Sequence, residues 1–187
     1  MNIGCILLAA GLSKRFGGDK LLTPLKGVPM GVYAIRLHGG LPYSHKVLIT
    51  QANRAPLIAA AQDYGFTVIV NPAPEEGIAS SLRLGLNALP LAETDGALFG
   101  VCDQPYLTRE TVARLTDTFQ KNPGYAVAPS FAGQRGNPVI FPREMFEELL
   151  SLKGDVGGGA LLKRHPEKLL LVPAASAAEL RDIDTKG

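Results

Sequence analysis

The sequence has few charged residues, only a small excess of positive charge and no long hydrophobic run. Charged residues make up 19% of its 187 residues and hydrophobic residues 46%. This balance excludes intrinsic disorder, because a disordered chain combines low hydrophobicity with high net charge. A formal charge of +2 gives no electrostatic argument for nucleic-acid binding. No apolar stretch approaches the roughly 18 residues of a membrane span, so we expect no membrane partner.

Cysteine is also scarce, with Cys5 and Cys102 each standing inside an apolar run. Isolated thiols without metal-type spacing are typical of buried small side chains in a reducing compartment. The apolar stretch from Ile3 to Ala10 lacks a basic leader, so it does not have the pattern of a secretory signal peptide. We therefore expect a cytoplasmic protein. The chain length corresponds to about one domain, and we predict a single one over residues 1–187.

Short apolar runs without polar alternation recur along the chain, which is typical of strands buried on both faces of a parallel sheet. The predicted strands are Gly4–Ala9, Lys46–Thr50, Thr67–Val70, Ala97–Val101, Tyr125–Pro129, Asn137–Phe141 and Leu169–Pro173. The predicted helices between them are Pro29–Leu37, Ala55–Tyr64, Ile78–Leu89, Thr108–Phe119, Arg143–Leu152 and Gly157–His165. This alternation predicts a doubly wound α/β fold with right-handed crossovers.

Ligands of such folds bind beyond the carboxyl ends of the strands, so the segments after the first, third and fourth strands are the candidates for a site. The first segment, residues 8–20, contains Gly11, Gly17 and Gly18 together with Ser13, Lys14, Arg15 and Lys20. Glycine lets backbone N–H groups approach an anion closely. Arg15 can hold two phosphate oxygens, and Lys20 adds a mobile positive charge. We interpret the segment as a phosphate cradle; the alternative is a flexible loop with solvated cations.

The second segment joins the third strand to a helix. Gly77, Ser80 and Ser81 stand near the start of that helix, where free N–H groups and hydroxyls can bind a base, a ribose or a phosphate. Simple capping of the helix by a serine is the alternative.

The third segment places Asp103 directly after the fourth strand. One carboxylate facing phosphates suits Mg²⁺, which takes one or two carboxylates together with phosphate oxygens and water. The alternative is that Asp103 caps the following turn. Near the end of the chain, Asp182 and Asp184 would share one face if they lay in a strand. One of them could complete a metal site with Asp103, and a solvated terminal segment is the alternative.

The sequence contains no evident pairing of a nucleophile with a base. His38, His45 and His165 lie away from all three segments. We interpret each as a surface or helix-end residue.

Taken together, these segments resemble the MobA-like nucleotidyltransferase family, and most closely its molybdenum cofactor cytidylyltransferase branch. The matching residues are Leu8-Ala9-Ala10-Gly11, Ser13, Arg15, Gly17, Gly18, Lys20, Gly77, Ser80-Ser81-Leu82, Cys102-Asp103-Gln104-Pro105, Arg135-Gly136-Asn137-Pro138, Gly154-Asp155, Gly157 and Asp182-Ile183-Asp184-Thr185. They span nearly the whole chain in the order found in the family.

The resemblance implies a three-layer Rossmann-like (GT-A-like) fold with a mostly parallel sheet, a nucleotide-binding part over about residues 1–107 and an acceptor-binding part over about 108–187. It implies Mg²⁺-dependent transfer of CMP from CTP to the phosphate of a molybdopterin-type cofactor, and it allows a transient contact with a recipient molybdoenzyme. The implied catalytic residues are Arg15, Lys20 and Asp103, and the implied metal ligands are Asp103, Asp182 and Asp184. The implied nucleotide-binding residues are Leu8, Ala9, Ala10, Gly11, Ser13, Gly17, Gly18, Gly77, Ser80 and Ser81. The implied acceptor-binding residues are Gln104, Arg135, Gly136, Asn137, Pro138 and Asp155.

Two positions bear on specificity. Ala10 stands where guanylyl-transferring relatives carry glycine, and a methyl group at the mouth of the loop would exclude the larger base. We therefore expect CTP to be preferred over GTP. Gly159 stands where the family often has arginine, which puts the binding or identity of the acceptor in question. The alternatives are a nucleotidyltransferase acting on a sugar 1-phosphate or another small phosphate, and a non-catalytic chaperone that carries cofactor to molybdoenzymes.

Overall fold

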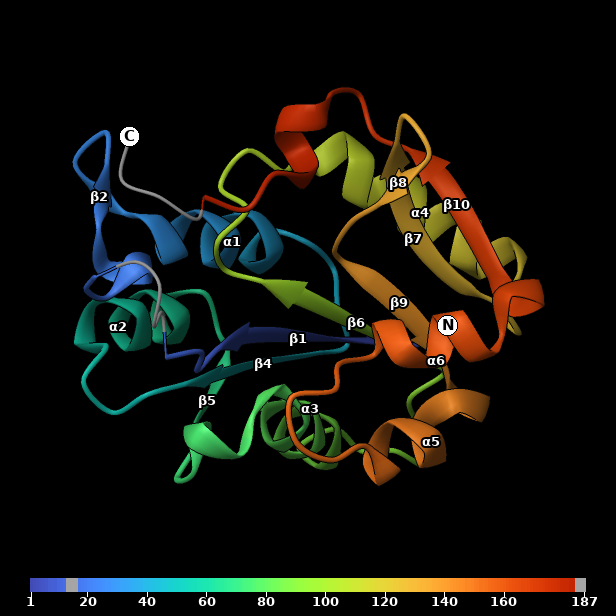
Figure 1. Ribbon diagram of the computed structural model, residues 1–187, viewed down its shortest axis with the longest axis horizontal. Coiled ribbons are helices and arrows are strands. Elements are labelled where there is room, and N and C mark those ends of the chain that lie inside the picture. The colour runs from blue at the N-terminus through green and yellow to red at the C-terminus, as the bar shows by residue number, and fades with distance from the viewer. Residues whose placement is uncertain (13–16, 184–187) are drawn as a thin grey trace.

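A mixed β-sheet runs through the middle of the computed structural model, which describes residues 1–12 and 17–183 (Figure 1). The strand order over this part of the chain is β5-β4-β1-β6-β9-β7-β10, and β8 pairs with β7. The strands are β1 (Ile3–Ala9), β4 (His45–Thr50), β5 (Thr67–Val70), β6 (Gly96–Val101), β7 (Ala126–Phe131), β8 (Gln134–Arg135), β9 (Val139–Pro142) and β10 (Leu169–Pro173). A separate hairpin consists of β2 (Pro24–Leu25) and β3 (Val28–Pro29).

The sheet is mostly parallel, as expected. Strand β1 pairs in parallel with β4 on one side and with β6 on the other, and β4 continues in parallel to β5. Among the described strands of this sheet, β9 and β8 run against the others. Strand β9 lies between β6 and β7, so these two strands are parallel to each other without being neighbours.

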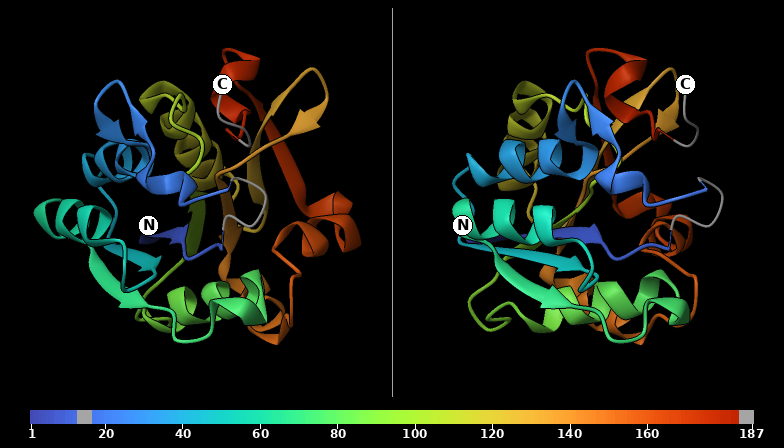
Figure 2. Two further views of the ribbon diagram at one scale, coloured as in Figure 1. Left: turned by 60° about the vertical axis from the view of Figure 1, so that its left-hand side comes forward. Right: turned by 90° about the vertical axis from the view of Figure 1, so that its left-hand side faces the viewer.

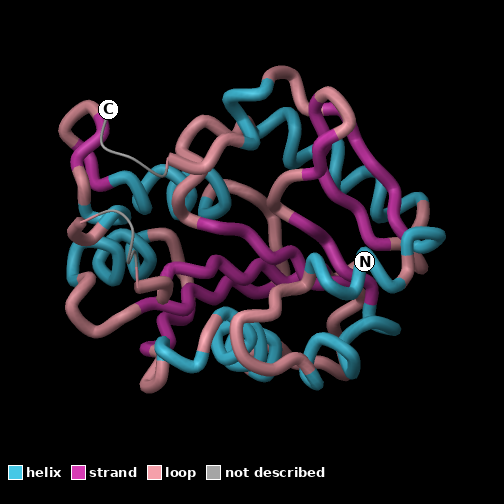
Figure 3. The backbone as a smooth tube through the Cα atoms, in the orientation of Figure 1, coloured by secondary structure: helices cyan, strands magenta, loops and turns pink. Residues whose placement is uncertain are grey.

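Helices cover both faces of the sheet and make three layers (Figures 1 and 2). One face carries α1 (Met30–Gly39), α2 (Ala55–Asp63) and α4 (Arg109–Lys121), and the other carries α3 (Ile78–Asn87), α5 (Phe146–Ser151) and α6 (Gly159–Arg164). Figure 3 shows the strands as a continuous band between the two helical layers. Adjacent strand residues point to opposite faces, so Leu7 packs with the first set of helices and Ile6 with the second.

Helix α3 lies unusually close to the central strand. A Cβ added at Gly85 would stand 2.4 Å from Cγ2 of Ile6. Because glycine leaves this space free, α3 packs directly on β1, and its first turn is held beside the end of that strand.

Short 3-10 helices connect several of these elements. They are η1 (Lys20–Leu22), η2 (Pro74–Glu76), η3 (Arg143–Met145), η4 (Pro166–Lys168) and η5 (Ala177–Leu180). The predicted helix over 143–152 is therefore split into η3 and α5. The other predicted helices and all the predicted strands occur within about two residues of their expected bounds. None of the described helices is long and apolar enough to cross a membrane.

Helix η5 is anchored at the start of α4 by a buried carboxylate. Glu179 is 2% exposed, and it accepts hydrogen bonds from the backbone and hydroxyl of Thr108 and from the backbone of Ala175. Burial raises the pKa of Glu179, but the hydrogen bonds from Thr111, Thr108 and Ala175 outweigh burial and leave it below its usual value. This anchor directs residues 180–183 past the end of β6, where Ile183 N–H donates to the carbonyl of Asp103.

Candidate active site

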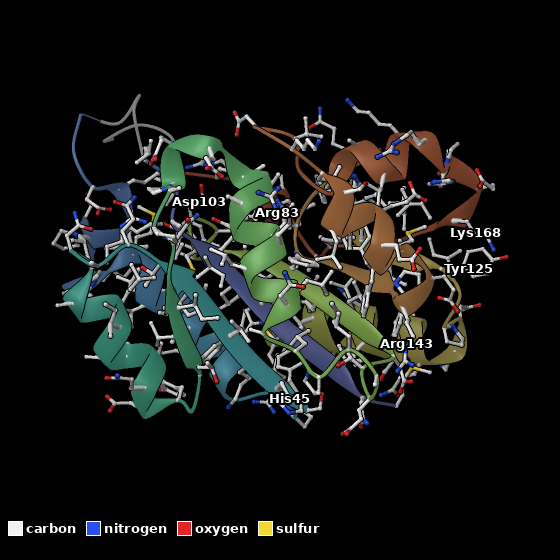
Figure 4. The ribbon with its side chains drawn as sticks, turned by 90° about the horizontal axis from the view of Figure 1, so that it is seen from below. His45, Arg83, Asp103, Tyr125, Arg143 and Lys168 are labelled. Atoms are coloured by element: carbon white, nitrogen blue, oxygen red, sulfur yellow. The ribbon has the colours of Figure 1, made fainter. Side chains whose placement is uncertain are left out.

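Most of the predicted site segments meet at the edge of the sheet where the parallel strands end. Figure 4 places Asp103 beyond one end of the strands and His45 at the opposite end. The segments that follow β1, β4, β5 and β6 lie together at this edge because neighbouring parallel strands begin and end at similar levels.

Lys20 and Asp103, which are 83 positions apart, form an ion pair at this edge, with the ammonium nitrogen 2.8 Å from Oδ2. The side chains of Lys20 and Asp103 are 10% and 26% exposed, respectively. Lys20 begins η1 and is itself buried. The prediction of a mobile loop cation at this position is therefore wrong: packing around the 3-10 turn and the carboxylate hold the ammonium group in place.

The glycine segment is held at both ends by Arg54, which lies just before α2. The Arg54 guanidinium donates to the carbonyls of Ala9 and Gly11, at 2.8 Å in the second case, and its Nε donates to Oδ2 of Asp19 at 2.7 Å. Arg54 is only 1% exposed. A neighbouring side chain, Gln51, adds hydrogen bonds of 3.0 Å to the carbonyls of Ala10 and Gly11. The carbonyls of residues 9 to 11 are thus all bound by side chains from the segment after β4.

Of the residues in the predicted phosphate cradle, Leu8 lies within β1 and is half-buried, whereas Gly17 and Gly18 are exposed to solvent. Ser13 and Arg15 lie outside the described residues, so their predicted roles in binding the nucleotide and the triphosphate stay predictions.

Asn71 joins the end of β5 to the first turn of α3. Its amide nitrogen donates to Oγ of Ser81 at 3.0 Å, and its amide oxygen accepts from Oγ of Ser80 at 3.1 Å and from the backbone of Ala73 at 2.9 Å. All three side chains of this network are buried. The two predicted serines therefore do not cap the helix, whose N-cap is Gly77 with no side-chain hydrogen bond. Their hydroxyls are held instead by the amide of Asn71.

The start of α3 contacts a segment from the far end of the chain. Gly77 has φ +89°, and a Cβ there would lie 2.5 Å from the carbonyl carbon of Gly154 and 2.6 Å from the backbone nitrogen of Asp155. The Gly154 carbonyl accepts from Ala79 N–H at 3.1 Å, and the Asp155 carboxylate lies 3.4 Å from Ile78 N. Gly77 is required both by its backbone conformation and by this close approach. Asp155, predicted to bind the acceptor, thus lies against the predicted nucleotide-binding part.

The C-terminal acidic residues are only partly described. Asp182 lies beside the segment after β6, because buried Gln104 donates to its Oδ1 at 2.8 Å and to the Leu180 carbonyl at 3.1 Å. The described residues 181–183 form no strand, so the argument from strand alternation is wrong there, and Asp184 lies outside the described part of the chain. Across residues 1–12 and 17–183, no three His, Cys, Asp or Glu side chains form a metal-binding cluster.

Arg135 is the first residue of the predicted acceptor-binding segment 135–138. Its Nη2 stands 2.9 Å from the position of a Cβ added at Gly159, so the guanidinium occupies the space that a side chain at 159 would take. Burial lowers the pKa of Arg135. Gly136 packs tightly against Leu180, and the Asn137–Pro138 peptide bond is cis. At Gly159, where an arginine was expected from the family pattern, the guanidinium of Arg135 from β8 therefore occupies the space beside the start of α6.

Two expectations about individual residues change. Ala10 is 3% exposed and its methyl group packs in the core on the α3 face, so it does not stand free at the mouth of the loop. His38 lies in the last turn of α1 but is buried, hydrogen-bonded to the Tyr43 hydroxyl at 2.9 Å, and burial lowers its pKa to about 4. His45 is exposed at the start of β4, and His165 follows α6. None of the three lies at the candidate site.

The thiols are unsuited to act as nucleophiles. Cys5 and Cys102 are free and buried. Burial and the neighbouring Asp103 raise the pKa of Cys102 to about 12, although the charge of Arg54 opposes the shift. Both thiols are protonated at neutral pH and serve as small packing residues, as predicted.

The residues missed from sequence are Gln51, Arg54, Asp19 and Asn71. A signal for the first two was present, because they follow a predicted strand whose carboxyl end lies at the same sheet edge. The candidate segments follow the first, third and fourth predicted strands and so leave out the segment after the second. Asp19 and Asn71 do lie in candidate segments, and Asn71 directly follows a predicted strand as Asp103 does, but residue type alone does not show which side chains they bind.

A glycine-containing segment after the central strand, with a lysine and a carboxylate at the carboxyl edge of a mostly parallel sheet, is typical of α/β proteins that bind nucleotides. The model of the MobA-like NTP transferase domain matches residues 5–169. The chain belongs to this family, and its fold is the Rossmann-like fold expected from the sequence.

Several known proteins and solved structures are similar over nearly the full length. The purine catabolism protein PucB of Bacillus subtilis is 28% identical, with 96% of this chain and 90% of PucB covered. The molybdenum cofactor guanylyltransferase of Cupriavidus metallidurans is 28% identical, with 98% and 91% covered. The crystal structure of Rv0371c from Mycobacterium tuberculosis superposes with a TM-score of 0.81 at 27% identity, covering 99% and 94%. A manganese complex of Rv0371c superposes with a TM-score of 0.75 at 25% identity, covering 94% and 90%.

Replacement of Gly77 tests the contact between α3 and the Gly154–Asp155 segment. We expect Gly77→Ala to lower the free energy of unfolding by about 1–3 kcal/mol, because the residue needs a conformation essentially restricted to glycine. Faster amide exchange at Ala79 should accompany the loss. Gly157→Ala is the matched control: a Cβ there makes ordinary contacts of 3.6 Å with Ile78, so stability should change by less than about 0.5 kcal/mol. Equal stability of the two variants in urea titrations would contradict this account.

Proposed function

We propose that this nucleotidyltransferase transfers CMP from CTP to the phosphate of a molybdopterin-type cofactor and releases pyrophosphate. The observation that carries the proposal is the Lys20–Asp103 pair beside the glycine segment at the carboxyl edge of the sheet. A cation and a carboxylate side by side suit a triphosphate with its metal ion, because one binds phosphate oxygens and the other binds the metal.

A divalent ion fits the donors at this edge. The Asp103 carboxylate is partly exposed, and Asp182 lies next to Gln104 in the adjoining segment. Mg²⁺ takes few protein carboxylates and keeps water and phosphate oxygens as its remaining ligands, so a cluster of three acidic residues is not required. Asp103 would hold the ion, with Asp182 or Asp184 as further candidates. A bound ion supplies positive charge to the phosphate oxygens.

The reaction requires positioned charge and no nucleophile from the protein. An oxygen of the acceptor phosphate forms a bond to the α-phosphorus of CTP, the bond from that phosphorus to the bridging oxygen breaks, and pyrophosphate leaves with the electron pair. Lys20 neutralises charge on the departing phosphates. This agrees with the absence of a histidine or reactive thiol from the described part of the site.

Acceptor binding is assigned to residues 135–138 and their surroundings. Arg135, Gly136, Asn137 and Pro138 lie on the segment that leads from β8 into β9, and Arg135 adds a guanidinium over Gly159. A guanidinium binds a phosphate through two parallel hydrogen bonds, which suits an acceptor that carries a phosphate monoester. Residues 1–107 would then bind mainly the nucleotide and 108–187 mainly the acceptor, with Asp155 at their junction.

The choice of base rests on the resemblance to cytidylyl-transferring enzymes. The buried position of Ala10 removes direct steric exclusion as its cause, so discrimination is assigned to the region from Gly77 to Ser81 that Asn71 fixes. GTP is the second candidate, because the Cupriavidus relative is named a guanylyltransferase. The other alternative functions are nucleotidyl transfer to a sugar 1-phosphate and non-catalytic delivery of cofactor to molybdoenzymes. The proposed cytidylyl transfer includes a transient contact with a recipient molybdoenzyme.

Pyrophosphate release across the four nucleoside triphosphates tests the proposal directly. With Mg²⁺ and molybdopterin, or its molybdate-loaded form, we expect kcat/KM for CTP to exceed that for GTP by at least about tenfold, since discrimination worth about 1.4 kcal/mol gives this ratio. A preference for GTP would overturn the choice of base and leave the transferase standing. Turnover only with sugar 1-phosphates would overturn the acceptor. Tight cofactor binding without pyrophosphate release from any triphosphate would favour the chaperone.

Asp103→Asn should lower kcat by at least about 10²-fold, because the amide binds a divalent ion far more weakly than the carboxylate and loses its charge. The matched control is Asp95→Asn at the opposite end of strand β6, where Asp95 lies 3.8 Å from Arg143 and accepts from Asn2 N–H. The control should keep the parent kcat, and circular dichroism should show both variants folded. A folded Asp103→Asn with parent turnover at saturating Mg²⁺ would make Asp103 a structural partner of Lys20.

Arg135→Ala should raise KM for the acceptor about tenfold or more and leave KM for the nucleotide unchanged, since a hydrogen bond to a charged group is lost. Gly159→Ala should raise the same KM by a smaller factor, because the new methyl group displaces the guanidinium. In the double variant the Gly159 effect should disappear. Arg164→Ala on α6, which loses only an exposed pair with Glu148, is the control. If the effects of Arg135→Ala and Gly159→Ala on the acceptor KM simply multiply, the proposed contact between Arg135 and position 159 is wrong.

A further inference from the structure

Arg54 is an almost completely buried cation that belongs to none of the motifs matched above. It is 1% exposed, and the charge of its guanidinium faces one carboxylate, that of Asp19. A buried charge is costly unless it is paired and fully hydrogen-bonded. All three guanidinium nitrogens have acceptors: Nε binds Asp19, Nη1 the Ala9 carbonyl and Nη2 the Gly11 carbonyl.

These contacts connect the two ends of the glycine segment. Ala9 ends β1 and Gly11 opens the segment, whereas Asp19 closes it. The second oxygen of Asp19 accepts from Leu21 N–H at 3.1 Å and so caps η1, which begins at Lys20. The path from Arg54 through Asp19 to Lys20 ends at Asp103, where Lys20 is held at 2.8 Å.

The contacts also decide where the backbone dipoles of the segment are directed. A carbonyl oxygen that faced a triphosphate would repel it, whereas a carbonyl bound to a buried guanidinium directs its negative end into the protein. Arg54 holds the Ala9 and Gly11 carbonyls in this way, and Gln51 holds those of Ala10 and Gly11. Lysine cannot replace this arrangement, because an ammonium group lacks the planar fork that reaches three acceptors at once.

We propose that Arg54 is a positioning residue for triphosphate binding: it holds the described ends of the glycine segment together, directs the carbonyls of Ala9 and Gly11 inward and sets the position of Lys20. This inference rests on the proposed function, because it takes the segment to be the triphosphate site. Arg54 acts through the segment and through Asp19, and it touches neither the reacting atoms nor the metal in this assignment.

Nucleotide affinity of the folded protein separates this role from a structural one. We expect Arg54→Lys to raise the equilibrium Kd for CTP with Mg²⁺ by about tenfold, the change produced by losing roughly one charge-assisted hydrogen bond, and to leave KM for the acceptor unchanged. Lys46→Gln is the matched control. Lys46 lies near the other end of β4 and donates to the carbonyls of Gly39 and Tyr64, at 3.1 and 2.6 Å. It should lower Tm without changing Kd.

A double-variant cycle tests the path to Lys20. The combined effect of Arg54→Lys and Lys20→Met on Kd should be smaller than the product of the single effects, because both disturb the same group. If Arg54→Lys does not fold, Asp19→Asn serves instead: it keeps the shape of the side chain, removes the charge that Arg54 pairs with and should raise Kd selectively.

The outcomes separate this inference from the proposed function. A parent protein that binds no nucleoside triphosphate at all overturns the proposed function. A parent that binds CTP or GTP, together with variants at Arg54 and Asp19 that bind it equally well, overturns the positioning role alone. If Arg54→Lys lowers Tm and leaves Kd for CTP unchanged, Arg54 has only a structural role. If the effects of Arg54→Lys and Lys20→Met on Kd multiply fully, Arg54 does not act through Lys20.

Discussion

The site depends on the pairing of β1 with a parallel strand on each side. In this register Ala9 lies opposite Thr50 of β4, and Leu8 lies opposite Val101 of β6. The segments that leave these three strands must therefore begin at one edge, within reach of one another. This explains how a guanidinium after β4, a glycine segment after β1 and a carboxylate after β6 form one connected set of contacts although the residues are far apart in sequence.

The charges of this set are arranged as alternating pairs. Arg54 faces Asp19, and Lys20 faces Asp103, so these two described cations each have a carboxylate oxygen within 3 Å. The two carboxylates are similarly exposed, with 22% of the Asp19 side chain and 26% of the Asp103 side chain accessible. Both cations are largely buried, at 2% for the Arg54 side chain and 10% for that of Lys20. Each pair therefore combines a buried cation, held in place by the protein, with a carboxylate that solvent can reach.

The C-terminal part of the chain is held at the candidate site by side-chain hydrogen bonds and a close backbone approach, not by strand pairing. Glu179 fastens η5 to the start of α4, and Gln104 holds the following residues through Leu180 and Asp182. On the other side, glycine at position 77 lets the start of α3 approach the backbone of Gly154 and Asp155. The predicted nucleotide-binding and acceptor-binding parts are consequently in contact along their boundary.

The sequence by itself determined the strands, the helices, the mostly parallel sheet and the edge that carries the site. The inner strands follow from unbroken apolar runs, which record burial on both faces. The same pattern was wrong about the burial of β5 and β10, because these strands lie at the two edges of the sheet and leave Val70 and Leu171 exposed. The carboxyl edge follows from parallel pairing, and it predicted that Lys20, Asp103, Gly77 and the two serines lie at one candidate site. Only the tertiary structure decided that Lys20 is held rather than mobile, that Ala10 points into the core and that Arg54, Asp19 and Asn71 hold the site together. Each of these depends on which atoms meet when the elements pack, and for Lys20 and Arg54 the partners lie 35 to 83 positions away. Spacing along one chain carries no record of such contacts.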